Sequence, residues 1–342
     1  MPVAVLSFPS LVQERICKEM NYSQLTAMSF CSLRMRKLIE FLSLTVPKLR
    51  YNSEDMHLRC EIPLREDANI VLVVRKNFLL EADTQEINLG GVKINGRFSS
   101  KLDKKGDIYY IIDVPRIDET IERAMQEHIN SLFHRSGPNS LVIKMSSHSQ
   151  IFPSLYEVAD SYIRGKSVDM KVLEDHFANN PNHHSVNIEA VINGEISEDS
   201  EIWNIEALSI RKQEAGMFLR RFTGRHLHLR HALAEASDVI FLLETWISSR
   251  YYLNLKTLYI SWKESHWLAY NGVMNRFQLT TRQEPSERPS HFKYDPQIIG
   301  MGSSNIELRT HNVFEIRRID GKKAFLHCHP KRIWLFVSDE PK

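Results

Sequence analysis

Cysteine side chains are the strongest nucleophiles and soft metal ligands that a chain can offer, and their spacing here limits what they can do. The four cysteines are scattered, and no two form a Cys-x-x-Cys pair: Cys17, Cys31, Cys60 and Cys328. This spacing excludes a zinc ribbon or a RING domain. It indicates free thiols in a reducing compartment rather than a disulfide framework.

Cys328 is the one cysteine flanked by potential bases, since His327 and His329 are its neighbours. A thiol acts as a nucleophile when nearby groups lower its pKa. In a strand, however, these three side chains would alternate between two faces and could not converge. We therefore expect no catalysis there.

A second group of histidines could bind a metal. His226 and His228 would share one face of a strand, with His231 just beyond it. Such imidazoles could hold a transition metal if a carboxylate joined them. The interpretation we adopt is that they are polar residues on the exposed rim of a strand, without a metal. His183-His184 lie in an Asn-Pro loop, where we expect them to be solvated.

Motifs for phosphate or acyl chemistry are absent from the sequence. Gly90-Gly91 and Gly300-x-Gly302 lack the Lys-Ser/Thr pair or the third glycine of phosphate-binding loops. No His-Glu-x-x-His or Gly-x-Ser-x-Gly motif occurs either. The sequence therefore predicts a chain without catalytic residues and without a cofactor.

Arginine and aromatic residues gather in the last third of the chain. Basic residues cluster at Arg211-Lys212, at Arg220-Arg221 and from Arg225 to Arg230, followed by Trp262 and Trp267. Such a mixture serves single-stranded nucleic acid or a protein interface. The net charge is only +2, from 44 basic and 42 acidic residues, which gives no general attraction to nucleic acid. We therefore favour a protein partner.

The composition is that of a globular protein, with 42% hydrophobic and 25% charged residues, and 342 residues suffice for two or three domains. No run approaches 18 apolar residues, so we expect no membrane-spanning helix. The first residues lack a basic region and are broken by Pro9, which makes a poor signal peptide. The setting we expect is the cytoplasm, the nucleus or both.

Three short helices are predicted within residues 8–41. Ser10-x-x-Gln13 has the spacing of a capping box at the start of the first helix, and Ser23 can cap the second. About 35 residues cannot bury enough apolar surface to fold alone. Their apolar stripes therefore need a second surface, either the rest of the chain or another protein.

This segment resembles an F-box, the module that docks a chain onto the Skp-type adaptor of cullin-RING ubiquitin ligases. The resemblance is carried by the opening Phe8-Pro9, by Ile16, by Leu25 and by a Phe-Cys-Ser, basic, Leu-Ile ending. Phe8 stands where leucine is commoner and Met35 where many members carry an aromatic residue, but both positions stay apolar. The resemblance implies adaptor contacts, or support of the three helices, from Phe8, Pro9, Leu11, Val12, Ile16, Met20, Leu25, Met28, Met35 and Ile39.

Residues 47–181 predict a small α+β unit that matches no family. Strand-like segments are residues 56–62, 69–74, 78–80, 108–114 and 141–145, and Gly90-Gly91 with Asn95-Gly96 indicates a hairpin. Apolar spacing predicts helices at residues 117–133, 153–162 and 168–177. A boundary follows at Asn179-Asn180-Pro181-Asn182, the strongest break in the chain.

After residue 182, short strands alternate with helices. Strands are predicted at residues 186–192, 205–210, 227–229 and 257–260, and helices at residues 214–222 and 238–248. This order favours parallel strands with helical crossovers, an arc like that of leucine-rich repeats. Asp320-Gly321 predicts a two-residue turn between residues 313–319 and 322–328, and residues 333–337 can pair as a third strand.

Part of this arc resembles the type 2 F-box-associated domain. Phe241-Leu242-x-x-x-Trp246-Ile247, then Leu255-x-x-Leu258-x-Ile260, follows its order of a helix ending in Trp-Ile and a strand. Trp203 with residues 205–210 resembles the entry of that domain, and residues 314–324 resemble its closing hairpin. We expect Trp203 and Trp246 to lie in the core.

The predicted fold class is α+β / α/β: an F-box at residues 1–46, an α+β region at 47–181 and a leucine-rich-repeat-like F-box-associated domain at 182–342. The resemblance implies a non-catalytic substrate-recognition subunit of a Skp–cullin–F-box ubiquitin ligase. Its partners would be the adaptor, through it a cullin, and a protein substrate. An alternative is a nucleic-acid-binding or structural scaffold whose N-terminal helices complete its own fold. Exposure of the apolar face of residues 8–41 discriminates between the two.

Overall fold

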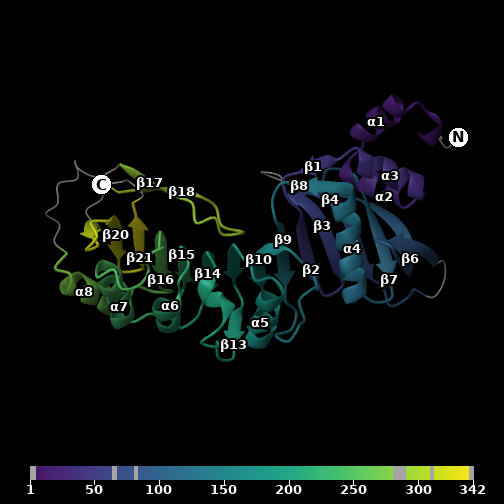
Figure 1. The fold of residues 1–342 in the computed structure, drawn as a ribbon. Coiled ribbons are helices and arrows are strands. Elements are labelled where there is room, and N and C mark those ends of the chain that lie inside the picture. The colour runs from purple at the N-terminus through teal and green to yellow at the C-terminus, as the bar shows by residue number, and fades with distance from the viewer. Residues whose placement is uncertain (1–4, 64–67, 81–83, 280–289, 309–311, 339–342) are drawn as a thin grey trace. The chain divides into compact units, whose positions relative to one another are not determined.

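The computed structural model describes residues 5–63, 68–80, 84–279, 290–308 and 312–338 (Figure 1). The chain forms two compact units: unit 1 is residues 1–146 with 151–159, and unit 2 is residues 147–150 with 160–342. Both units combine helices with mixed β-sheet, so the predicted fold class is confirmed. The predicted boundaries after residues 46 and 181 stay predictions.

The three predicted N-terminal helices are present in unit 1: α1 (Ser10–Lys18), α2 (Tyr22–Ser29) and α3 (Leu33–Phe41). The predicted capping box at Ser10 is wrong, because Pro9 precedes α1 and Gln13 Nε2 donates to the main-chain oxygen of Phe8 (2.6 Å). A capping box occurs instead at α2, where Asn21 and Gln24 bond to each other's main-chain N–H.

Ser23 was predicted to cap α2 but lies inside it and is buried. Its hydroxyl accepts a hydrogen bond from the Tyr110 main-chain N–H (3.1 Å). Tyr110 belongs to β7 (Ile108–Val114), so this bond attaches α2 to the sheet. Figure 1 shows α1 on the outer side of α2 and α3, away from the strands. Among its nine residues α1 buries only Cys17, whereas α2 packs on the sheet of unit 1.

The sheet of unit 1 has the strand order β9-β2-β3-β4-β7-β6-β5. Pairing is parallel between β2 and β9 and between β4 and β7, and antiparallel elsewhere. Its strands are β2 (Arg50–Glu54), β3 (His57–Pro63), β4 (Ala68–Lys76), β5 (Gln85–Leu89), β6 (Val92–Leu102), β7 (Ile108–Val114) and β9 (Asn139–Lys144). A separate parallel pair joins β1 (Leu44–Val46) to β8 (Phe133–Arg135). The predicted hairpin turn falls at Gly90-Gly91, both with positive φ, and Asn95-Gly96 lies inside β6.

One buried histidine links the N-terminal helices to the rest of unit 1. His128 belongs to α4 (Glu119–Leu132), and its ring stacks on Phe30 at 4.3 Å between centroids. The Gly90 N–H donates to Nδ1 (3.3 Å), so Nε2 carries the proton and donates to Ser29 Oγ (2.7 Å). Burial lowers the pKa of His128 to about 3 and keeps the ring neutral.

Two predicted elements, residues 78–80 and residues 153–162, are wrong. Residues 78–80 form a turn rather than a strand, in which the Leu79 N–H donates to Asn77 Oδ1. Residues 153–162 do not form a helix. Side chains of α4 take main-chain hydrogen bonds of the first half, since Glu122 accepts from the Ser154 N–H (2.8 Å) and Gln126 from the Tyr156 N–H (3.0 Å), and residues 158–162 of the second half belong to a strand. Phe152, Leu155 and Val158 are buried three residues apart, which imitates a helical period.

The sheet of unit 2 has the order β10-β12-β14-β15-β16-β21-β20-β19. The first five strands are parallel: β10 (Val158–Arg164), β12 (Ser185–Ile188), β14 (Ala207–Arg211), β15 (His226–Arg230) and β16 (Thr257–Ser261). The parallel pairing of the last four was predicted, whereas β10 begins within residues 153–162, where a helix was expected. The predicted closing hairpin joins β19 (Val313–Arg317) to β20 (Lys323–His329), and β21 (Arg332–Val337) pairs antiparallel with both β20 and β16. A short parallel pair joins β11 (Ser167–Asp169) and β13 (Val191–Asn193).

The two faces of this sheet differ in chemistry because side chains alternate along each strand. One row of residues in register is fully buried and apolar: Val186, Leu208, Leu227 and Leu258. The next row is polar or aromatic: Tyr162, Asn187, Ser209, His228, Tyr259 and Trp334.

Helices and a hairpin flank this sheet on two sides (Figure 1). The helices run along one side: α5 (Met170–Asn179), α6 (Ala215–Arg221), α7 (Ala236–Ile247) and α8 (Trp267–Arg276). On the other side lies a hairpin of β17 (His291–Tyr294) and β18 (Ser304–Glu307). Tyr294 of this hairpin stacks on His228 and on Trp334, so the hairpin covers the polar row.

Candidate functional site

The first candidate surface is the exposed apolar part of α1 and the residues before it. Phe8, Leu11 and Val12 are 39%, 78% and 42% exposed, and we call these three residues the α1 surface. Pro9 beside them is exposed as well. Single exposed apolar residues are ordinary, but three within five positions at the start of one short helix form a local apolar surface.

The structure divides the ten residues that the F-box resemblance implied. Four are exposed, namely Phe8, Pro9, Leu11 and Val12, and three are partly buried, namely Ile16, Met20 and Met28. Leu25, Met35 and Ile39 lie in the core of unit 1 and support the helices instead. Leu33 and Phe41 on α3 are 67% and 82% exposed and were missed, because the family pattern did not single them out.

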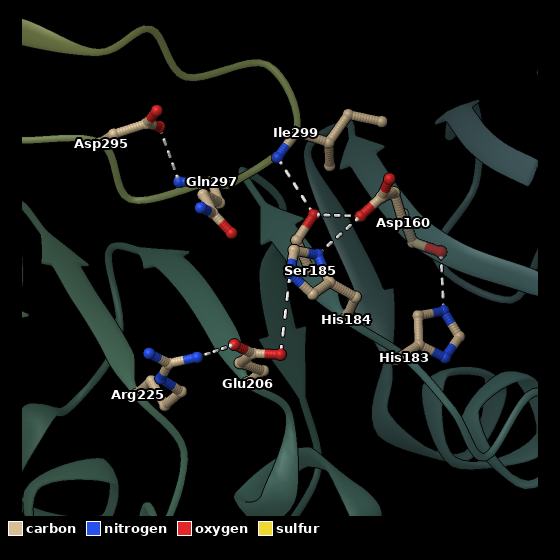
Figure 2. A network of polar contacts seen from close by, with 10 residues as sticks. Asp160, His183, His184, Ser185, Glu206, Arg225, Asp295, Gln297 and Ile299 are labelled. Carbon is tan, nitrogen blue, oxygen red and sulfur yellow. Dashed lines mark hydrogen bonds and ion pairs between the residues drawn. The ribbon is translucent and has the colours of Figure 1, made fainter. Parts of the chain in front are cut away.

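The second candidate is a chain of polar contacts at the start of the parallel strands of unit 2 (Figure 2). His184, just before β12, lies with Nδ1 3.4 Å from Asp160 Oδ1 and Nε2 3.7 Å from Glu206 Oε2. Arg225 Nη1 donates to Glu206 Oε1 at 2.9 Å. The prediction that His184 is solvated is only partly right, since its side chain is 38% exposed.

The electrostatics of this chain of contacts favour a protonated His184. Its hydrogen bond to Asp160 raises the pKa of the imidazole, burial opposes this, and the charges of Asp160 and Glu206 add to the rise. Ser185 is next to His184 but donates its hydroxyl proton to Asp160 Oδ1 (2.7 Å) and not to the imidazole. A serine whose proton points at the carboxylate is not activated by the histidine, so these residues do not form a nucleophilic triad.

His183 has the opposite surroundings and is buried, so its predicted solvation is wrong. Its Nδ1 lies 2.6 Å from the Asn180 main-chain oxygen, which can only accept, so Nδ1 carries the proton. Its Nε2 then accepts from Ser161 Oγ (2.9 Å), and Ser161 Oγ accepts in turn from His176 Nε2 (2.9 Å). Burial lowers the pKa of both imidazoles, that of His176 to about 3, and both stay neutral.

Two of the three histidines considered as metal ligands, His226 and His228, have separate partners. His226 Nδ1 contacts Thr257 Oγ1 (2.8 Å), and His228 Nδ1 contacts the Tyr294 hydroxyl (3.1 Å). His228 is fully buried, so its predicted place on an exposed rim is wrong; the β17–β18 hairpin covers it. Within the residues that the structure describes, no group of three or more His, Cys, Asp or Glu side chains is placed to hold a metal ion.

Cys328 lies in β20 and is buried. Burial raises the pKa of its thiol to about 12, and burial together with the charge of Arg332 lowers the pKa of His327 to about 4. A thiol with a raised pKa forms little thiolate at neutral pH, and a neutral imidazole beside it has no charge to stabilise the thiolate. These surroundings give no support to a nucleophilic Cys328.

Four arginines of the basic clusters of unit 2 pair with carboxylates. Arg220 pairs with Asp238, Arg221 with Glu198, Arg225 with Glu206 and Arg230 with Glu189. Such pairs neutralise charges that a nucleic-acid backbone would need. Arg220 and Arg221 line a hollow of about 800 Å³ together with Trp203 and Tyr251, aromatic residues that the sequence did not group with them. Trp203 and Trp246 are buried, as predicted.

Comparison of the chain with protein-family models, with curated proteins and with solved structures found no match. These comparisons therefore assign no function to the chain or to the two candidate sites. In the part of the chain that the structure describes, no helix combines the length and the apolarity needed to cross a lipid bilayer.

Proposed function

We propose that the chain is the substrate-recognition subunit of a Skp–cullin–F-box ubiquitin ligase complex in the cytoplasm or nucleus. The N-terminal helices would bind the adaptor, and unit 2 would capture the protein to be modified. The subunit needs no catalytic residue of its own in this role. It raises the effective concentration of a substrate lysine near a charged conjugating enzyme.

The observation that carries the proposal is the exposure of the α1 surface. The inner faces of α2 and α3 pack on unit 1 through Leu25, Met35 and Ile39, so these two helices complete the fold of their own chain. Phe8, Leu11 and Val12 on the α1 surface have no such packing. An apolar surface that the chain leaves open, within a segment of F-box pattern, supports docking of another protein.

A nucleic-acid-binding role is not proposed, because four arginines of the basic cluster are engaged with carboxylates. The hollow beside Trp203, Arg220 and Tyr251 has the composition of protein interfaces, in which Trp, Tyr and Arg predominate. This observation supports a protein as the partner of unit 2.

The test is binding of the full-length chain to a purified Skp-type adaptor, with a Leu11→Asp, Val12→Asp double variant beside the wild type. Both residues are exposed, so the variant should fold, as circular dichroism will show. Burying two carboxylates without partners in the interface should weaken binding by about 100-fold or more. Isothermal titration calorimetry measures the two affinities.

The matched control is Leu268→Asp, an equally exposed leucine of unit 2 that should leave adaptor binding unchanged. Absence of wild-type binding at micromolar adaptor would contradict the ligase role. Equal binding by the wild type and the double variant would show that the adaptor does not use the α1 surface.

A further inference from the structure

The sheet of unit 2 binds both main-chain polar groups of one residue in a loop of its own chain. In the loop between β17 and β18, the Ile299 N–H donates to Ser185 Oγ (3.1 Å) and the Ile299 carbonyl accepts from Asn187 Nδ2 (3.0 Å). Ser185 and Asn187 are two residues apart on β12 and therefore share a face. We call Ser185 and Asn187 the main-chain clamp, since they bond to the main-chain N–H and the main-chain carbonyl of Ile299 and not to polar atoms of a side chain.

Neighbouring strands orient the main-chain clamp before anything binds to it. Ser185 Oγ donates to Asp160 on β10 (2.7 Å), which leaves its lone pairs free to accept from a main-chain N–H (Figure 2). Arg230 Nη2 on β15 donates to Asn187 Oδ1 (2.8 Å). This bond fixes the amide so that its NH₂ group faces the loop. Groups held in their binding geometry in advance lose little entropy on binding.

The same face offers hydrogen-bonding groups that the loop leaves unused. Ser209 and His228 lie in register with Asn187 on the next two strands, and both are fully buried. Among the described residues, Ser209 Oγ and His228 Nε2 have no hydrogen-bond partner. Buried polar groups are nearly always paired in folded proteins, so two unpaired groups in one row indicate a ligand other than the loop.

The loop is attached firmly at its base and only locally at its tip. At the base, Tyr294, Ile306 and Leu308 pack into a hydrophobic cluster with Phe325 and Phe336. The cluster can stay packed when the tip leaves the sheet.

At the tip, Ile298 is buried, and the Met301 N–H donates to the Ile298 carbonyl across a turn. Gly300 in this turn has φ +77°, and a Cβ there would lie 2.6 Å from the Tyr162 ring. The tip is therefore held by the Ile298 side chain, the main-chain clamp, a close glycine contact and a side-chain hydrogen bond between Gln297 and His184.

We propose that this face of unit 2 is a peptide-binding site, and that residues 295–300 occupy it in the free protein. The ligand is a short segment of a protein with a large aliphatic residue in the place of Ile298. The following residue is held by the main-chain clamp, and a polar side chain reaches Ser209 and His228. The assignment of this ligand to a ligase substrate rests on the proposed function; the binding itself does not.

The test uses the full-length chain with residues 295–302 replaced by a Gly-Ser segment of equal length. The probe is a fluorescent synthetic peptide with the sequence of residues 293–302, and a scrambled peptide is the control. Anisotropy should show binding to the replaced-loop protein at least about tenfold tighter than to the wild type, whose own loop competes. Adding Asn187→Leu should weaken it about tenfold, as loss of a good hydrogen bond does.

A second experiment distinguishes a site that binds other peptides from a surface that only packs against the protein's own loop. Peptides selected from a random library on the replaced-loop protein should compete with the loop peptide and should lose affinity on Ser209→Ala. The loop peptide itself, which does not use Ser209, should be unaffected by that substitution. Selection of no competing peptide, or binding that ignores Asn187→Leu, would overturn the proposal.

Gly300→Val is the second way to open the site, since its side chain would strike the Tyr162 ring and displace the tip. If both the replaced-loop and the Gly300→Val proteins fail to fold, the loop is a structural part of unit 2 and the proposal is wrong. The assay contains no adaptor, so its outcome is independent of the adaptor-binding test.

Discussion

His183 and His184 are neighbours in the sequence but differ in almost every physical property. His183 is buried, neutral and part of a chain of hydrogen bonds through Ser161 to His176. His184 is partly exposed and lies between the carboxylates of Asp160 and Glu206. The pKa of His183 is lowered chiefly by burial, and that of His184 is raised chiefly by its bond to Asp160.

The difference shows that two successive residues just before a strand can meet opposite surroundings. His183 is linked through Ser161 to His176 of α5, whereas His184 lies between two carboxylates at the polar edge. At His183, burial lowers the pKa of the imidazole and favours its neutral form. At the edge, two carboxylates favour the charged form. Each histidine therefore contributes to stability in a different range of pH.

The largest effect should come from the buried side. His176→Ala removes a buried ring and leaves Ser161 without one of its partners. We expect the free energy of unfolding to fall by about 3 kcal/mol at pH 7, from the cavity and the unpaired group together. Urea titration followed by circular dichroism measures it. His148→Ala, an exposed histidine, is the control and should change stability little; equal effects of the two variants would show that the buried chain of hydrogen bonds is not stabilising.

A lower pH should change the stabilisation by His176 and the stabilisation by His184 in opposite directions. The folded-state pKa of His176 is about 3, far below its ordinary 6.5, so its stabilisation is present above pH 6.5 and is lost as the pH falls toward 3. The wild type should therefore lose about 2 kcal/mol of its advantage over His176→Ala between pH 7 and pH 5.

His184 should behave in the opposite way. Its raised pKa gives stabilisation that is complete below 6.5 and is lost as the pH rises through the folded-state value. The advantage of the wild type over His184→Gln should be larger at pH 5.5 than at pH 8.5, by less than about 1 kcal/mol because solvent screens this site. Urea titrations at the two pH values measure both differences, and changes of the same sign in the two variants would contradict the comparison.

The smallest effect should be a shift in one titration curve. Asp160→Asn removes the first cause of the raised pKa of His184, whereas Glu206→Gln removes only a more distant charge. The pKa of His184 should fall in both variants, and further in Asp160→Asn. NMR titration of the imidazole protons measures both shifts. The reverse order would place the main charge partner of His184 at Glu206 instead.

The parallel strands of unit 2 could be predicted because their pattern is local. Residues 205–210, 227–229 and 257–260 each alternate apolar side chains that pack on the helices, and the strands occur close to where they were expected. Residues 153–162 could not be predicted in this way. Their main-chain groups bond to Glu122 and Gln126 about thirty positions away, which no local pattern reveals.

The two proposed binding surfaces also differ in how far the sequence alone could predict them. The exposed residues of the α1 surface belong to one short motif, and the sequence pointed to Phe8, Leu11 and Val12. The main-chain clamp depends on Ile299, more than a hundred residues beyond Ser185 and Asn187. A signal was present nonetheless, since Ser185, Asn187, Ser209 and His228 place polar side chains on one face of strands that are otherwise apolar. Their common face became visible only when the register of the strands was known.

The antiparallel pairing of β16 with β21 has a consequence for the chain during its synthesis, because β21 follows β16 by about seventy residues. Translation delivers β16 long before β21, so the outer edge of residues 257–261 stays unpaired on the ribosome until residues 332–337 emerge. An open edge next to Leu258 and Ile260 can pair with another nascent chain. Synthesis that stops before residue 313 would make this exposure permanent, so a premature stop codon there would yield an aggregating fragment rather than a shorter working protein.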